Sequence, residues 1–178
     1  CEPQFKELFK PPAEQLQVEE IASQMQQLFY EIKFSSYLEQ AKKDKIQPQS
    51  LLKLWQSLQG LFRRFAELLV INRRYCSAET VISNTFINEK RKLEHYFNLP
   101  DNTQQRVAGE FDCLVFNFER KRLCVVEFKT YQPLDPSAQL AQVALYSYML
   151  WQKKKVAVDS AVYCVLPEFK EYYYSWEQ

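Results

Sequence analysis

Two short segments carry the residues best suited to chemistry. In the segment Cys124–Lys129, strand alternation puts Glu127 and Lys129 on one face and apolar residues on the other. Asp112 precedes this segment, and the charged tetrapeptide 119–122 between them predicts a turn. In the resulting hairpin, Asp112 and Glu127 are expected to come close together on neighbouring strands.

Two carboxylates and an ammonium in an otherwise apolar sheet are costly unless something compensates their charge. A divalent cation does so, and Mg²⁺ prefers carboxylate and water oxygens while keeping positions open for phosphate oxygens. Lys129 could then orient or deprotonate a water molecule, or meet charge developing on the phosphate. Because Glu-x-Lys alone is not specific, an edge strand with a solvated charged face is the alternative interpretation.

A second pair of polar residues lies further along the chain. Gln142 and Tyr146 are four residues apart, so they share one face of a predicted helix. An amide and a phenol placed there can reach a phosphate or a base, while apolar neighbours such as Leu140 and Val143 pack behind them. The alternative is that Tyr146 belongs to the core and Gln142 to its rim.

Apolar periodicity predicts the elements that position these residues. In chain order they are a helix over Ala13–Lys43, a helix from a Ser50 cap to Arg73 or Arg74, a short strand over Glu79–Ser83, a segment 85–97 open between strand and helix, strands over Val107–Phe118 and Leu123–Thr130, a helix from Asp135 or Ser137 to about Leu150, and a buried strand over Val158–Leu166. This order predicts an α/β fold with a mixed sheet flanked by helices. We expect a helical extension over residues 1–48 and a core over residues 49–178.

Composition excludes several classes of function. The chain has two glycines and one histidine, which exclude a phosphate-binding P-loop, a dinucleotide-binding turn and a multi-histidine metal site. The net charge of +1 excludes a broad basic coat, although a local basic channel remains possible. Five cysteines without close spacing predict free thiols in a reducing compartment, the cytoplasm. No apolar run approaches the roughly 20 residues that span a bilayer, so no membrane partner is expected.

Taken together, the segments Gly109–Asp112, Glu127–Thr130 and Gln142–Tyr146 resemble the three ordered motifs of the PD-(D/E)XK nucleases, most closely the RecB/Cas4/Dna2-type branch. The resemblance implies a restriction-endonuclease-like αβββαβ core and metal-dependent cleavage of DNA, single-stranded or duplex. It implies that Asp112 and Glu127 bind Mg²⁺ or Mn²⁺, that the backbone carbonyl of Phe128 adds a ligand, and that Lys129 is the catalytic lysine. DNA repair, recombination and phage defence are the settings it suggests.

The sequence also departs from this family. Many relatives carry a metal-binding histidine on the helix before the first strand, whereas residues 60–67 contain none. Glu67 or Glu79 is the candidate to replace it. The cysteines that hold an iron–sulfur cluster in some relatives are absent, so no such cluster is expected.

DNA contacts are expected from basic residues, and these would make binding salt-sensitive. The candidates are Arg63 and Arg64, then Arg73, Arg74, the run 90–92 and the run 153–155. Most such runs are solvated faces in other proteins. Two alternatives stay open: a catalytically inactive nuclease fold that binds DNA or assembles a larger complex with a helicase, an ATPase or another nuclease subunit, and an interaction domain whose hairpin charges are structural.

Overall fold

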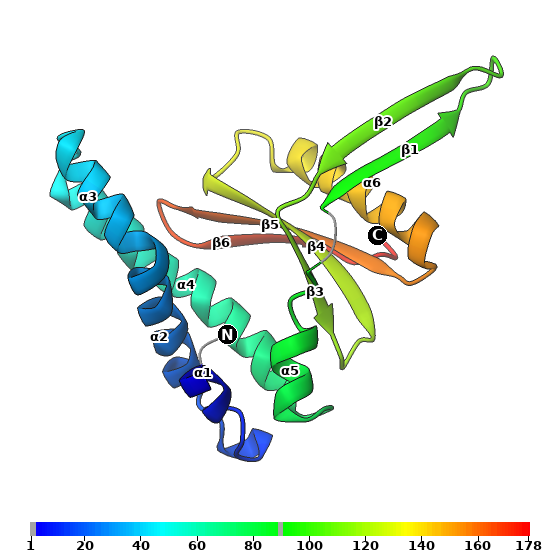
Figure 1. The fold of residues 1–178 in the computed structure, drawn as a ribbon. Helices are drawn as coiled ribbons and strands as arrows, with labels where there is room; N and C mark the ends of the chain where they lie inside the picture. Colours follow the sequence, from blue (N-terminus) through cyan, green and yellow to red (C-terminus); the bar gives the residue numbers. More distant parts are fainter. Residues whose placement is uncertain (1–2, 89–90) are drawn as a thin grey trace.

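The computed structural model describes residues 3–88 and 91–178, so Cys1 and Lys90, which belongs to the basic run 90–92, lie outside the described part. The chain begins with short helices and ends with strands (Figure 1). The elements are α1 (Pro3–Glu7), the 3₁₀ helix η1 (Ala13–Gln15), α2 (Val18–Phe29), the π-helix η2 (Tyr30–Phe34), α3 (Ser35–Lys43), α4 (Pro48–Arg73), α5 (Ala78–Asn84), β1 (Lys92–Asn98), β2 (Gln104–Glu110), β3 (Cys113–Asn117), β4 (Arg122–Tyr131), α6 (Pro136–Lys154), β5 (Val158–Leu166) and β6 (Lys170–Tyr174).

The main sheet has the strand order β3-β4-β5-β6. β4 pairs antiparallel with β3 and parallel with β5, and β6 pairs antiparallel with β5. The sheet is therefore mixed and flanked by helices, which confirms the predicted α/β class. The helix α6 provides the crossover between the parallel strands β4 and β5.

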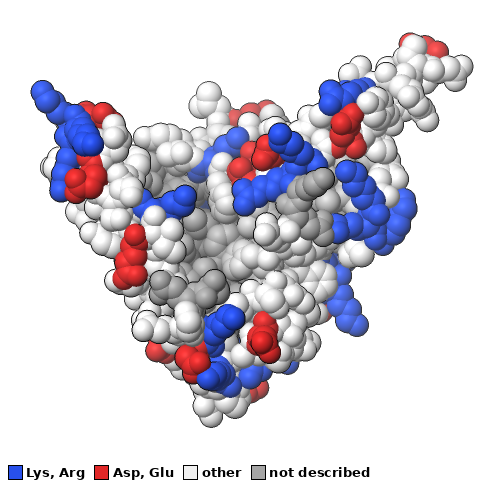
Figure 2. Space-filling view, in the orientation of Figure 1, with Lys and Arg blue, Asp and Glu red and all other residues white. Residues whose placement is uncertain are grey.

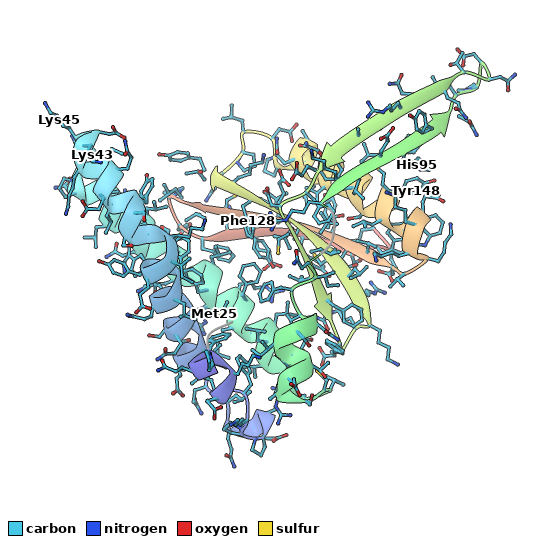
Figure 3. All side chains as sticks on the ribbon, viewed as in Figure 1. Met25, Lys43, Lys45, His95, Phe128 and Tyr148 are labelled. Atoms are coloured by element: carbon cyan, nitrogen blue, oxygen red, sulfur yellow. The ribbon has the colours of Figure 1, made fainter. Side chains whose placement is uncertain are left out.

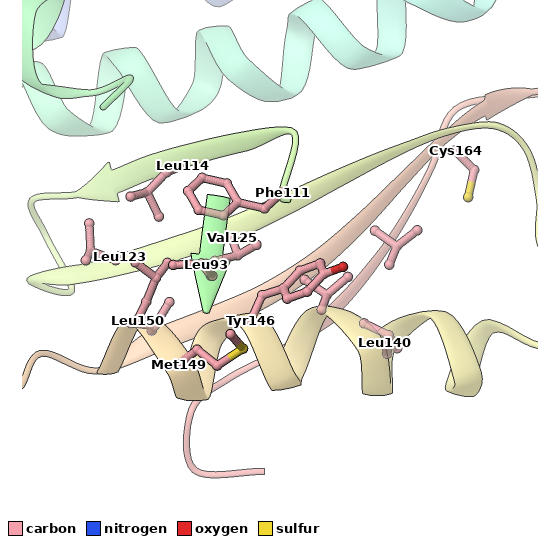
Figure 4. Packing of buried hydrophobic residues seen from close by; sticks show 13 residues of the cluster. Leu93, Phe111, Leu114, Leu123, Val125, Leu140, Tyr146, Met149, Leu150 and Cys164 are labelled. Carbon is pink, nitrogen blue, oxygen red and sulfur yellow. The ribbon is translucent and has the colours of Figure 1, made fainter. Parts of the chain in front are cut away.

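Each face of this sheet is covered by one long helix. Side chains of α6 such as Val143 and Met149 pack on Val125 and Val162 in one buried cluster (Figure 4). On the opposite face, Phe65 and its neighbours on α4 pack on β4 and β5. Because both faces of β4 and β5 are covered, these inner strands are apolar on both sides except at their ends.

The N-terminal helices pack along α4 on its side away from the sheet (Figure 1). Phe9 and Ile21 share a buried cluster with Ala66 and Leu69 of α4. No helix in the described residues is long and apolar enough to cross a membrane. The four described cysteines are free thiols: Cys76, Cys113, Cys124 and Cys164.

Two predictions around α4 are wrong: the type of the element that follows it and the residue at which it begins. The segment Glu79–Ser83 is not a strand but lies in α5, where the Ser77 hydroxyl accepts the Thr80 N–H at 3.2 Å. The N-cap therefore makes this short apolar run a helix, although the alternation of a strand fits the run equally well. Helix α4 begins at Pro48, before Ser50, because proline lacks the N–H that the first turn leaves unpaired.

The predicted strand over Val107–Phe118 is two strands that belong to different sheets. β2 ends at Glu110 and β3 begins at Cys113, with the buried Phe111 and Asp112 at the break. β2 pairs with β1, which settles part of the open segment 85–97 as a strand. The helix α6 begins as expected, since the Asp135 carboxylate accepts the N–H of Ser137 at 3.0 Å.

The outer edge of β3 is bonded to other parts of the chain. The Phe116 N–H donates to the Thr85 carbonyl at 2.9 Å, and the Phe118 N–H donates to Oδ1 of Asn72 at 2.8 Å. Asn72 is fully buried at the C-terminal end of α4. This side chain therefore fixes the helix to the edge of the sheet.

Candidate active site

The hairpin β3–β4 brings the two predicted carboxylates together. Cys113 pairs with Val126 in antiparallel register, so Asp112 lies opposite Glu127 one step beyond that pair. Residues directly opposite each other in an antiparallel pair point to the same face. Glu127 and Val125 are two residues apart on β4, so their side chains share a face, and Val125 packs in the cluster under α6. Both carboxylates therefore lie on the α6 side of the sheet.

Asp112 is fixed to the neighbouring strand by its side chain. Its Oδ2 accepts the backbone N–H of Phe128 at 2.8 Å. Phe128 lies near the middle of the sheet, where the strands cross in the view of Figure 3. The bond holds one carboxylate oxygen at the sheet, so the orientation of Asp112 relative to Glu127 is set before any ligand binds.

Glu127 is a largely enclosed carboxylate with one buried, unsatisfied oxygen. Its side chain is only 13% exposed, and Oε1 lies 3.6 Å from Nζ of Lys129. Glu127 Oε2 is one of two buried side-chain atoms in residues 3–88 and 91–178 that have no hydrogen-bond partner. Burial raises the pKa of Glu127, and the nearby charge of Asp112 raises it further, while Lys129 acts in the opposite direction. The site therefore favours an added positive charge.

Lys129 lies beside this partly buried pair of carboxylates. Its side chain is 36% exposed, so the ammonium can meet both Glu127 and solvent. In the parallel register Lys129 pairs with Cys164 of β5, whose thiol is fully buried. Of the three predicted catalytic residues, Asp112 and Glu127 are partly buried, and Lys129 is more accessible than Glu127.

The donor atoms fit a hard divalent cation. Glu127 and Asp112 supply carboxylate oxygens, and Mg²⁺ is commonly held by one or two carboxylates while water and substrate oxygens complete its coordination. The predicted carbonyl ligand belongs to Phe128, whose N–H already binds Asp112. Within the described ranges, no group of three or more His, Cys, Asp or Glu residues could hold a metal ion. The protein part of the site is therefore a carboxylate pair.

The structure does not bring Glu67 or Glu79 to this pair. Glu67 lies on α4, which covers the opposite face of the sheet, and its Oε1 is 3.4 Å from Nε of Arg63. Glu79 lies exposed in the first turn of α5. The sequence does not separate these faces, because no local pattern in it indicates which side of the sheet each helix covers.

The two arginines predicted to contact DNA also lie away from the carboxylates. Arg63 is exposed between Glu19 and Glu67, at 3.3 and 3.4 Å. Arg64 donates from Nε to Glu171 of β6 at 2.6 Å and is largely enclosed in that ion pair. Both residues belong to α4 and therefore to the other face of the sheet.

Gln142 and Tyr146 do lie on the same face of the sheet as the carboxylates. Nε2 of Gln142 donates to the Tyr146 hydroxyl at 3.1 Å. Tyr146 is 7% exposed and belongs to the cluster beneath the sheet (Figure 4), whereas Gln142 is exposed. The tyrosine ring is thus part of the core, and its hydroxyl connects the core to an accessible amide.

Gly109 leaves the space that the Tyr146 ring occupies. A Cβ atom at position 109 would lie 2.4 Å from Cε1 of Tyr146. This close approach ties the end of β2, three residues before Asp112, to the helix that carries Gln142. The Gly-x-hydrophobic-Asp pattern therefore has a packing reason in this chain.

Replacing Gly109 with Ala is expected to destabilise the protein by about 1–3 kcal/mol, because the ring must shift in a packed core. Urea denaturation measures this change in the free energy of unfolding. The same substitution in a Tyr146→Ala background should cost less, since the clash is removed. Equal costs in the two backgrounds would show that the contact does not determine the choice of glycine.

Sequence reasoning missed Gln139. Its Oε1 is the second buried side-chain atom without a hydrogen-bond partner in the described part of the chain. Gln139 lies three residues before Gln142, so the two amides share one side of α6. The helical spacing from Gln142 could have suggested this residue, because the pattern i, i+3, i+7 includes both Gln139 and Tyr146.

Comparisons with known proteins add little to this geometry. No family model matches the chain, and no curated protein does. Among the solved structures, one described as the crystal structure of SSO0001 is similar with 14% sequence identity and a TM-score of 0.36. The match covers 96% of this chain and 65% of that one, so this chain spans about two thirds of the length of that protein. A similarity this distant does not identify a function.

Proposed function

We propose that this chain is a metal-dependent nuclease domain of the PD-(D/E)XK type, which hydrolyses phosphodiester bonds in DNA. The observation that supports it most is the buried, partnerless oxygen of Glu127 beside Asp112 and Lys129. A buried carboxylate oxygen without a hydrogen-bond partner is costly, and a bound cation would compensate it. The helix α4, the hairpin β3–β4, the crossover helix α6 and the parallel strand β5 also suit the restriction-endonuclease-like core that the motifs imply.

In this proposal Asp112 and Glu127 hold Mg²⁺ or Mn²⁺, which supplies Lewis-acid activation of the phosphodiester when bound. Lys129 orients the attacking water by donating to it as the ammonium or, as the neutral amine, accepts its proton at Nζ, and its exposure lets it reach that water. Gln142 holds the DNA backbone with its amide, while Tyr146 fixes the position of that amide. Asp112 keeps its orientation through the bond from the Phe128 N–H.

Digestion of a supercoiled plasmid and of single-stranded DNA tests the proposal directly. We expect cleavage with Mg²⁺ or Mn²⁺ and none with EDTA. Cleavage that persists in EDTA would exclude a metal-dependent reaction. No cleavage with either metal, despite salt-sensitive DNA binding, would favour the second candidate described next.

A catalytically inactive nuclease fold is the second candidate. The bond from the Phe128 N–H to Asp112 Oδ2 favours it, because this carboxylate oxygen already has a partner within the protein. It is also favoured by the lack of a third acidic ligand in the described residues. Such a module would bind DNA or a helicase or ATPase subunit without cutting.

The Gln142–Tyr146 pair provides a test that separates binding from folding. Gln142→Ala removes an exposed amide, so turnover or DNA affinity should fall while the melting temperature stays nearly unchanged. Tyr146→Phe removes only the hydroxyl that positions this amide, and a smaller loss of the same kind is expected. Tyr146→Ala is the packing control, with an expected cost of about 3–5 kcal/mol in stability.

A nuclease assay and a thermal melt on the same preparations measure both effects. If Gln142→Ala and Tyr146→Phe both cut DNA at the wild-type rate, the pair serves only the core and its rim. The similarity to the RecB-type branch would then be limited to the two strand motifs.

A further inference from the structure

The hairpin of β1 and β2 forms a second, two-stranded sheet that projects from the body of the protein (Figure 1). We call residues 92–110 the arm. Its inner face packs on α6: the rings of His95 and Phe97 lie 6.2 and 5.8 Å from that of Tyr148, and Figure 3 labels His95 and Tyr148 side by side. Because an isolated two-stranded sheet is marginally stable, these contacts fix its base.

The outer face of the arm is polar. Tyr96 is 51% exposed, and it pairs across the arm with Arg106. Nε of Arg106 donates to Oε1 of Glu94 at 2.7 Å, and the Tyr96 hydroxyl donates to the same oxygen at 2.8 Å. A hollow of about 440 Å³ lies on this face, lined by Ala108 and its neighbours on the arm and by Lys153 near the C-terminal end of α6.

Basic side chains outnumber acidic ones around this hollow. Lys92, Arg106 and Lys153 line it together with two carboxylates, Glu94 and Glu110. Arg106 and Glu94 form an ion pair, so Lys92 and Lys153 stand against the single further carboxylate of Glu110, a net charge of +1. Further basic residues adjoin the hollow in sequence at Arg91 and Lys155. Figure 2 shows basic side chains gathered on the flank below the arm. The local charge therefore complements an anionic ligand, although the whole chain is nearly neutral.

The base of the arm leads into the segment that carries the proposed active site. β2 ends at Glu110, two residues before Asp112, and Gly109 lies against Tyr146, so the base of the arm adjoins the proposed site. A seven-residue strand extends about 23 Å. The major groove of DNA, about 12 Å wide, admits a two-stranded ribbon. The far part of the arm carries two exposed amides on its outer face, Asn98 and Gln104, which pair across the arm and can donate and accept hydrogen bonds.

We infer that the outer face of the arm and the end of α6 bind duplex DNA beside the cleavage site, with Lys92, Arg106 and Lys153 contacting phosphates. This inference rests on the proposed function, because it supplies the surface on which the DNA substrate lies. Phosphate contacts by exposed cations add affinity that depends on salt and not on sequence. The amides of the far part then lie along the groove.

Binding of a fluorescent 30-base-pair duplex, measured by anisotropy at several salt concentrations in EDTA, tests the inference without cleavage. The double variant Arg106→Gln/Lys153→Gln should bind more weakly, and the slope of log affinity against log salt should fall by about 2, since each lost phosphate contact removes about 0.9. Glu94→Gln should bind more tightly, because it removes a carboxylate from the same face. These exposed substitutions spare the core, and a thermal melt checks the fold.

The matched control is Lys43→Gln/Lys45→Gln, which removes two exposed charges at the far end of the molecule from the arm (Figure 3). Wild-type affinity and salt slope in the arm variant, or an effect equal to that of the control, would overturn the inference. So would a loss confined to single-stranded DNA. A wild type that binds through the arm but does not cut with Mg²⁺ or Mn²⁺ would support the arm and contradict only the proposed nuclease activity.

Discussion

Replacing Lys129 with Ala is expected to lower the rate of DNA cleavage by at least about 100-fold, the lower range for loss of a general acid or base. The side chain is partly exposed and has only a 3.6 Å ion pair with Glu127, so little stability depends on it. The chain has 23 Lys and Arg residues, so one of them supplies a small share of the DNA affinity. Single-turnover cleavage, duplex binding and a thermal melt measure the three quantities.

Lys170→Ala is the matched control for this variant. Lys170 of β6 pairs with Cys164 from the other side, so it carries the same charge on the same face of the sheet. We expect it to cut DNA at close to the wild-type rate. Wild-type cleavage by Lys129→Ala would assign Lys129 a structural role and would remove the basis of the nuclease proposal.

Glu127→Gln is expected to have effects of opposite sign on activity and stability. Metal-dependent cleavage should fall by at least about 10- to 100-fold, because losing a ligand costs no less than losing one of its supporting contacts. Without metal the variant should be more stable, since it removes a buried charge beside Asp112. Each kcal/mol gained raises the melting temperature of a chain of this size by about 2–4 °C.

Differential scanning calorimetry with EDTA and with Mg²⁺ measures the melting temperature of each variant with and without metal. Wild-type protein should gain stability from Mg²⁺, and Glu127→Gln should gain much less. Glu168→Gln, an exposed glutamate in the loop after β5, is the control and should behave like the wild type. If Glu127→Gln lowers stability in EDTA, the glutamate is a structural hydrogen-bond acceptor and does not bind metal.

The carboxylate pair could be predicted from the sequence because its geometry depends on local information. A charged turn between two apolar strands sets the register, and the register brings Asp112 opposite Glu127. The cap at Asp135 likewise fixes the start of α6. Strand alternation then assigns the faces, so the site needed no knowledge of distant contacts.

The rest of the site depended on which side of the sheet each helix covers. Glu67 and Arg64 lie on α4, and no local pattern indicates that α4 and α6 take opposite faces. The separate sheet of the arm could not be predicted from the sequence either. Its alternating apolar residues, such as Leu93 and Phe97, are typical of any strand, but here they pack on α6 and do not enter the main sheet. β6 was missed because its inner residues are aromatic and only half-buried.

The bonds along the outer edge of β3 have a consequence for association between copies of the chain. An exposed strand edge presents unpaired N–H and C=O groups and templates edge-to-edge aggregation. In this protein the segment that contains Thr85 and the side chain of Asn72 already occupy donors along that edge. Growth of the sheet by adding a strand from another molecule is therefore blocked at β3, next to the hairpin that carries the carboxylates.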